Sequence, residues 1–189
     1  KNYSAKQTLS GVLKIMPHIS DQNVLRILSV AEKISVNPAF KERVLVIEEK
    51  IKQKHPTLEI VRRLNNQLSS VPKNKLITNL FANAMFEGTA RRQEIYEQEQ
   101  WRPPFFFVLS PTMRCNLNCT GCYAAQYTKK DVITTEQIDR IFTEAKELGI
   151  YFVTISGGEP FYRKDLPELW QKHNDMFFLV YTNGTLIDA

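Results

Sequence analysis

The sequence predicts an α/β chain in two parts, an all-helical region over residues 1–100 and a parallel strand–helix–strand–helix–strand unit over residues 101–189. Apolar residues recur at helical spacing through the first part, whereas three continuous apolar runs, separated by helical segments, occupy the second. Trp101-Arg102-Pro103-Pro104 marks the junction, because two consecutive prolines end any preceding helix.

Four segments of the first part have an apolar helical face, which predicts a core of packed helices. Pro38, Pro56 and Pro72 fit first helical turns, where the missing amide hydrogen of proline costs nothing. The prolines are 18 and 16 residues apart, spacings that are also compatible with a helical-repeat array. The faces comprise Val24, Ile27, Leu28 and Ala31; Phe40, Val44, Ile47 and Ile51; Leu58, Val61, Leu64 and Leu68; and Leu76, Ile77, Leu80, Phe81 and Ala84.

The second part begins with a predicted buried strand over 105–109, a continuous apolar run. The helix predicted next begins at Thr134, which stands three residues before Gln137 as in a capping box. Its apolar face reaches Leu148, and Gly149 suits its C-terminal stop.

Two further apolar runs, 151–155 and 177–181, predict the second and third strands, and a short helix from Asp165 lies between them. This order of elements favours parallel pairing. Because α/β proteins bind ligands outside the carboxyl ends of their strands, the polar segment after each strand is a candidate for the site.

All three cysteines of the chain, Cys115, Cys119 and Cys122, follow the first strand in one CxxxCxxC segment. Closed iron–sulfur and zinc sites usually take four protein ligands. Three thiolates leave one metal position without a protein ligand, which suits a site where a small molecule binds the metal directly. The count therefore favours chemistry over a purely structural site.

Other interpretations of these cysteines are a disulfide, buried free thiols and structural zinc. The odd count and the lack of a visible signal peptide disfavour a disulfide, and the polar loop disfavours buried thiols. Zinc requires a fourth ligand from His18, His55 or His173, none of which lies near the cysteines in sequence. Zinc remains the alternative metal.

The cysteine segment resembles the cluster motif of the radical S-adenosylmethionine (SAM) superfamily, and two more segments stand where that family places its ligand loops. They are Ser156-Gly157-Gly158-Glu159-Pro160, after the second strand, and Thr182-Asn183-Gly184-Thr185, after the third. The resemblance implies that Cys115, Cys119 and Cys122 hold a four-iron, four-sulfur (4Fe–4S) cluster. The fourth iron then binds the amino and carboxylate groups of SAM.

The same resemblance implies a radical SAM enzyme of unassigned reaction. One electron from the reduced cluster cleaves the sulfonium of SAM, and the resulting 5′-deoxyadenosyl radical abstracts hydrogen from a substrate. The implied partner is a flavodoxin- or ferredoxin-like reductant, and the expected location is the cytoplasm. No catalytic residue beyond the cofactor ligands is assigned. The alternative from another class is a noncatalytic iron–sulfur or zinc-binding interaction module.

The SAM contacts implied by the resemblance lie mainly in Gly157, Gly158, Glu159 and Pro160, which look like the segment that meets the methionyl amino group largely through its backbone. Glycines let a backbone approach a ligand closely, Pro160 cannot extend a strand, and Glu159 suits a cationic amino group. An ordinary strand-to-helix turn is the alternative for the same residues.

Ser156 and Asn183 are further candidate contacts, and Asn183-Gly184 is also a common turn pair. The family often has an aromatic residue before the third cysteine, whereas this chain has Gly121 there. Tyr123 follows that cysteine instead and is predicted to pack near the cluster or the adenine. The family fold is a barrel of six βα units, so the resemblance implies a partial (βα)6 barrel that is truncated after its third strand.

Charge divides along the predicted junction. Residues 1–100 contain 16 Lys and Arg against 10 Asp and Glu, and residues 101–189 contain 9 against 10. A basic helical region attracts an acidic partner, nucleic acid or an anionic membrane surface, although solvated helix faces are the simpler interpretation because no compact basic run occurs. No run approaches the roughly 18 apolar residues of a membrane-spanning helix.

Overall fold

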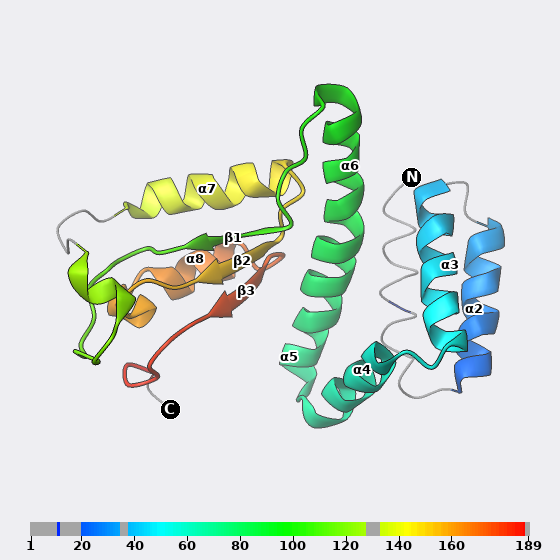
Figure 1. Ribbon diagram of the computed structural model, residues 1–189, viewed down its shortest axis with the longest axis horizontal. Helices are drawn as coiled ribbons and strands as arrows, with labels where there is room; N and C mark the ends of the chain where they lie inside the picture. Colours follow the sequence, from blue (N-terminus) through cyan, green and yellow to red (C-terminus); the bar gives the residue numbers. More distant parts are fainter. Residues whose placement is uncertain (1–10, 12–19, 35–37, 128–132, 188–189) are drawn as a thin grey trace. The chain divides into compact units, whose positions relative to one another are not determined.

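The computed structural model describes residues 11, 20–34, 38–127 and 133–187. By its contacts the chain divides into two compact units, 1–82 and 83–189. The described part of the first unit is helical, and the second unit contains a three-stranded parallel sheet with helices (Figure 1). The predicted mixed α/β class with three parallel strands is confirmed. The domain boundary near residue 100 stays a prediction.

Helices α2 (Asp21–Ile34) and α3 (Pro38–Lys52) pack against each other in the first unit. Val24 and Leu28 of α2 are buried, as are Val44 and Ile51 of α3. These four belong to the two apolar faces predicted first. The side chains of Ala31, Phe40, Leu58, Val61 and Leu64, from the predicted faces, lie outside the described residues.

Two of the three prolines begin helices as expected: Pro38 begins α3 and Pro56 begins α4 (Pro56–Gln67). Pro72 is the third residue of α5 (Ser70–Lys75) and so also lies in a first helical turn, as predicted. After α5 the chain continues as a π-helix, η2 (Leu76–Glu87), and then as α6 (Gly88–Glu99). Sequence periodicity did not predict α6, since only Gly88, Arg92 and Ile95 of that helix are buried.

The sheet consists of β1 (Phe106–Leu109), β2 (Phe152–Ile155) and β3 (Phe177–Val180), with β2 between two parallel neighbours. Each strand lies within a predicted run and is one residue shorter. The register aligns Phe106, Phe152 and Phe177 across one face of the sheet. All three carboxyl ends therefore meet at one edge.

Helices α7 (Thr135–Glu147) and α8 (Leu166–Lys172) pack on the face of the sheet that lies opposite these three phenylalanines. The core between these layers contains Val153 and Ile155 from β2, Phe142 from α7 and Leu166 from α8. Thr134 and Gln137 form the predicted capping box, with bonds of 3.2 and 2.8 Å. Gly149 follows α7 at a φ of 76°, a backbone conformation that favours glycine.

The opposite face of the sheet is mostly apolar, with Thr154 as a buried polar residue on the central strand, and its outer strands are exposed in the described structure. Phe106, Val108 and Leu179 are exposed there by 46%, 58% and 41%. The Phe152 ring lies between those of Phe106 and Phe177, at centroid distances of 5.5 and 5.4 Å. Aromatic side chains thus form a row across this open face.

Candidate functional site

Three loops leave the carboxyl ends of the strands and carry every site residue predicted from the sequence. The β1 loop holds the cysteines, the β2 loop is 156–160, and the β3 loop is 182–185. Ser156 N–H donates to Leu109 O at 2.9 Å, and Tyr181 N–H donates to Ile155 O at 2.9 Å. These bonds continue the sheet beyond the strands and hold the loops beside one another.

The β2 loop packs backbone to backbone against the chain that precedes the cysteines. Gly158 N–H donates to Thr112 O and Glu159 N–H donates to Arg114 O, both at 2.9 Å. A Cβ atom on Gly158 would overlap Arg114 O, and one on Gly157, where φ is 108°, would overlap Thr112 O. These glycines therefore allow close approach to the backbone that precedes the cysteines, and their contact with SAM stays a prediction.

Glu159 links the β2 loop to the β3 loop. Its carboxylate is 1% exposed. Oε1 accepts hydrogen bonds from Thr182 Oγ1 at 2.8 Å and Phe161 N–H at 3.0 Å, and Oε2 accepts one from Asn183 N–H at 2.8 Å. In this geometry the carboxylate positions a loop, a role that differs from the predicted contact with a cationic amino group. Pro160, five residues beyond the end of β2, begins the short 3-10 helix η4 (Pro160–Tyr162).

Tyr123 joins the far side of the cysteine segment to the β2 loop. It begins the 3-10 helix η3 (Tyr123–Gln126), directly after Cys122. Its hydroxyl accepts a hydrogen bond from Gly157 N–H at 3.0 Å and lies 3.0 Å from Ser156 Oγ and 3.2 Å from Gly157 O. Ser156 and Tyr123 thus contact each other, and the Gly157 amide is bonded to the Tyr123 hydroxyl.

The three cysteines are free thiols, Cys115 partly exposed and the other two exposed. Cys115 Sγ accepts hydrogen bonds from Leu117 N–H at 3.5 Å and from Asn183 Nδ2 at 3.8 Å. Three unpaired sulfurs, one of them already receiving N–H donors, suit an iron–sulfur cluster, whose ligand sulfurs are hydrogen-bonded in this way. Within the described ranges, no three His, Cys, Asp or Glu side chains converge closely enough to hold a single metal ion.

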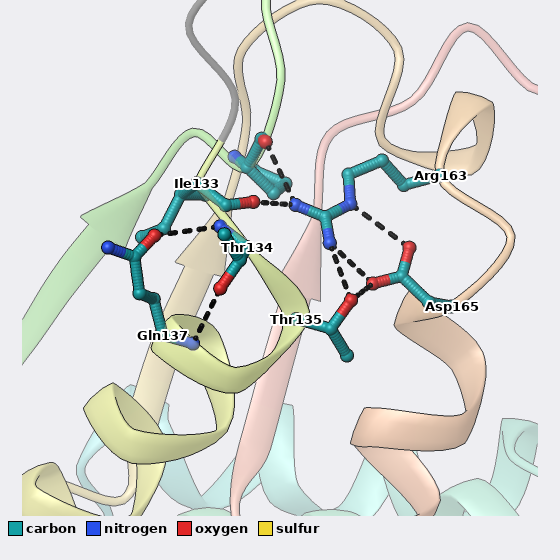
Figure 2. Close-up of polar contacts among 7 residues, drawn as sticks. Ile133, Thr134, Thr135, Gln137, Arg163 and Asp165 are labelled. Carbon is teal, nitrogen blue, oxygen red and sulfur yellow. Dashed lines mark hydrogen bonds and ion pairs between the residues drawn. The ribbon is translucent and has the colours of Figure 1, made fainter.

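Arg163 contacts both ends of the segment 111–133, which contains the cysteines, and Figure 2 shows its contacts with Ile133, Thr135 and Asp165. Its guanidinium donates to Pro111 O at 3.3 Å, to Ile133 O and to Thr135 Oγ1 at 3.1 Å, and it forms an ion pair with Asp165. Arg163 is the main cause that lowers the pKa of Asp165 from 3.8 to about 2, and the Thr135 hydroxyl contributes.

The histidines proposed as zinc ligands divide into two cases. His173 is 3% exposed, its Nε2 lies 2.8 Å from Asp139 Oδ1, and its ring packs against Phe142 in the helical layer. His55 lies in the first unit, and His18 lies outside the described residues. The structure therefore places His173 in a structural contact.

Sequence reasoning missed several residues that organise this site: Thr112, Asn116, Arg163, Asp165 and Thr182. Asp165 was predicted only as a helix start, and its spacing of two residues from Arg163 is the local signal for their pairing. Asn116 and Thr182 stand next to residues that were predicted, but their partners lie on other loops. Those partners become apparent only when the strands are paired.

Residues 109–189 match the family model described as the Radical SAM superfamily. The Fe-coproporphyrin III synthase of Methanosarcina barkeri is 40% identical over 88 residues, which are 43% of this chain and 21% of the synthase. A probable GTP 3′,8-cyclase of Methanothermobacter thermautotrophicus is 34% identical over 92 residues, 47% of this chain and 30% of the cyclase. The PqqA peptide cyclase of Granulibacter bethesdensis is 39% identical over 90 residues, 46% of this chain and 24% of that enzyme.

The chain thus spans less than a third of the length of these curated relatives. No solved structure gives a significant match. In the described part of the chain, every helix is too short or too polar to cross a bilayer.

Proposed function

We propose that the chain is the cluster-binding part of a radical SAM enzyme, on the basis that residues 109–189 match the Radical SAM superfamily model. The observation that supports this most strongly is the packing of a loop with three free thiols against the glycine-bearing loop of the next strand. When bound, a 4Fe–4S cluster and SAM supply the chemistry, a one-electron cleavage that yields methionine and a hydrogen-abstracting 5′-deoxyadenosyl radical.

Cys115, Cys119 and Cys122 are the proposed cluster ligands. Their number leaves one iron for the amino and carboxylate groups of SAM. Gly157 and Gly158 keep the β2 loop against the residues that precede Cys115, and the same loop is proposed to contact SAM. In this proposal the side chains of this chain hold the cluster and position the adjacent loops.

Ser156, Glu159, Pro160, Asn183 and Tyr123 are proposed to surround the cofactors, and the contacts described above favour positioning roles for three of them. Glu159 holds the β3 loop, Tyr123 holds the β2 loop, and Asn183 donates to Cys115. Direct contact with SAM is accordingly assigned to backbone groups of the β2 loop more than to the Glu159 carboxylate.

We propose that the residues that select the substrate lie outside the matched segment. The three relatives are named for Fe-coproporphyrin III, GTP and a peptide, and each aligns with this chain over about 90 residues. Because proteins with such different names share a segment of similar length with this chain, we propose that the segment supplies cofactor chemistry and does not select the substrate. We therefore leave the reaction on the substrate unassigned.

The sheet is proposed to be the first half of a (βα)6 barrel, whose remaining strands cover its open aromatic face. The exposure of Phe106, Val108 and Leu179 supports this, since apolar sheet faces are normally packed. A flavodoxin- or ferredoxin-like reductant is the proposed electron donor, and the reducing cytoplasm suits an oxygen-sensitive cluster. The basic region 1–100 is proposed to contact an acidic partner.

Reductive SAM cleavage tests the proposal directly. Cluster-loaded protein, reduced with dithionite under anaerobic conditions, is expected to form methionine and 5′-deoxyadenosine, which mass spectrometry quantifies. Cys119→Ala protein is the control and is expected to form neither. The alternative, a noncatalytic iron–sulfur or zinc module, predicts bound metal without cleavage and without any spectral response to SAM.

A further inference from the structure

We propose that Asn183 raises the reduction potential of the cluster by donating a hydrogen bond to the sulfur of Cys115. This inference rests on the proposed function, since it requires Cys115 to be a cluster ligand. It assigns Asn183 a positioning and tuning role that acts through Cys115. The contact itself joins two loops that lie 68 positions apart in the sequence, with Asn183 Nδ2 at 3.8 Å from Cys115 Sγ.

The orientation of the Asn183 amide is determined by its neighbours. Its Oδ1 accepts hydrogen bonds from Thr185 N–H at 2.9 Å and Thr185 Oγ1 at 2.7 Å. A backbone N–H is only a donor, so the oxygen of the amide must face Thr185 and the nitrogen must face the opposite side. On that side lie Cys115 Sγ and Asn116 Oδ1, the latter at 3.0 Å.

The amide has no free hydrogen-bonding capacity after these contacts. Its two N–H groups are matched by the Cys115 sulfur and the Asn116 oxygen, and its oxygen already receives two donors. Asn116 is fixed in turn, because its Nδ2 donates to Thr185 Oγ1 at 2.8 Å. A side chain that is saturated in this way acts on the sulfur, whereas a direct contact with SAM would require one of these bonds to break.

The backbone of Asn183 is also anchored. Its N–H donates to Oε2 of the buried Glu159 carboxylate at 2.8 Å, and the neighbouring Thr182 hydroxyl donates to Oε1 of the same group at 2.8 Å. The donor is therefore held in position by the β2 loop, which lowers the cost of making this hydrogen bond. Glu159 thus supports the cluster through Asn183.

The electrostatic consequence has a definite sign. Reduction adds negative charge to the cluster and its ligand sulfurs, and an N–H donor stabilises that charge more in the reduced state than in the oxidised state. Asn183 therefore favours reduction. Its loss lowers the potential, so that a smaller fraction of the cluster is reduced at any fixed poise.

The test uses the full chain with its reconstituted cluster, without SAM, in a redox titration followed by electron paramagnetic resonance. Asn183→Leu removes the amide, and Asn183→Asp removes the N–H groups while retaining an acceptor for Thr185. Both variants are expected to lower the ratio of reduced to oxidised cluster at fixed poise about threefold to tenfold, where tenfold equals about 59 mV for a one-electron couple.

Asn118 supplies matched controls, because it is exposed in the same cysteine loop. Asn118→Leu and Asn118→Asp are expected to keep the wild-type ratio or, for the charged variant, to change it less than Asn183→Asp does. Equal shifts at the two positions would show that the effect is not specific to the Asn183 hydrogen bond and would overturn the proposal. Wild-type potentials in both loaded Asn183 variants would also overturn it.

Iron and sulfide analysis separates this inference from the proposed function. Wild-type protein without iron and sulfide would refute the proposed function itself. Loss of the cluster from both Asn183 variants, with the wild type loaded, would assign Asn183 a purely structural role and would contradict tuning. Loaded variants with lowered potentials support the proposal.

Discussion

The two ends of the parallel sheet use glycine in the same way but differ in what they leave accessible. At the amino end, Gly88 of α6 meets Gly149 before β2, and a Cβ atom on either would overlap the backbone of the other. At the carboxyl end, Gly157 and Gly158 meet the backbone that precedes the cysteines in the same manner. Glycines therefore allow close packing of backbone on backbone at both ends of the sheet.

Buried polar side chains at the amino end of the sheet form hydrogen bonds with other groups of the protein. Arg92 is 5% exposed and donates to Gly149 O and Thr89 Oγ1, and its guanidinium lies 5.2 Å from the centre of the Phe105 ring. Asn83 Nδ2 donates to Asp175 O at 2.7 Å. The carboxyl end instead presents three free thiols. The cysteines, more than the glycines, therefore distinguish the candidate site from the amino end of the sheet.

The largest expected effect comes from adding a methyl group at each end. Gly158→Ala and Gly88→Ala should each lower the free energy of unfolding by about 2–3 kcal/mol, because the new Cβ overlaps backbone atoms. Only Gly158→Ala should also lower the iron content per folded chain. Urea unfolding and iron analysis on reconstituted protein measure the two effects, and equal iron contents would remove the distinction between the ends.

A smaller effect on stability is expected when the pH is lowered, and it arises from Asp165 near the carboxyl end of the sheet. The folded pKa of Asp165, about 2, lies below its unfolded value near 3.8, so folding favours the ionised form. The stabilisation by the Arg163–Asp165 pair is therefore complete above about pH 5 and declines as the pH falls toward 2.

Asp165→Asn should consequently have a lower free energy of unfolding than the wild type at pH 7. This difference in free energy should shrink below pH 4. Urea unfolding at several pH values measures this. Glu144→Gln is the control, since Glu144 is an exposed partner of Arg140 on α7. A difference between Asp165→Asn and wild type that stayed constant from pH 7 to pH 2.5 would contradict the lowered pKa.

The smallest effect is expected for Tyr123→Phe, which removes the hydroxyl that accepts from Gly157 N–H. Unfolding should become easier by about 1 kcal/mol, the usual contribution of one hydrogen bond at a partly exposed site. Most of the cluster loading should remain, since the ring does not supply a ligand. Loss of the cluster equal to that of a cysteine variant would refute this minor role.

Local sequence signals predicted the elements of the second unit well. The three apolar runs predicted strands because buried parallel strands are continuously hydrophobic. The capping box at Thr134 and the left-handed Gly149 located both ends of α7, since each depends on neighbouring residues only. Helix α6 escaped prediction because its buried contacts, above all those of Arg92, are made with residues 57 positions away.

The sequence predicted which loops meet at the carboxyl edge of the sheet, but not which of their side chains contact one another. The resemblance placed the cysteines, the β2 loop and Asn183 together, and the parallel sheet brings all three loops to one edge. The partners of Glu159, Tyr123 and Asn183 depend on the spacing between loops, which no single segment encodes. The bonds of the Glu159 carboxylate to the β3 loop were therefore not predicted, and its contact with SAM stays a prediction.

The most direct test of the central claim is the iron and acid-labile sulfide content of anaerobically reconstituted protein and its cysteine variants. The wild type is expected to hold about four iron and four sulfide per chain. Cys115→Ala, Cys119→Ala and Cys122→Ala should each lose stable loading while circular dichroism shows the helices and strands retained. Stoichiometric zinc without sulfide in the wild type, or unchanged cluster content in the three variants, would contradict the account.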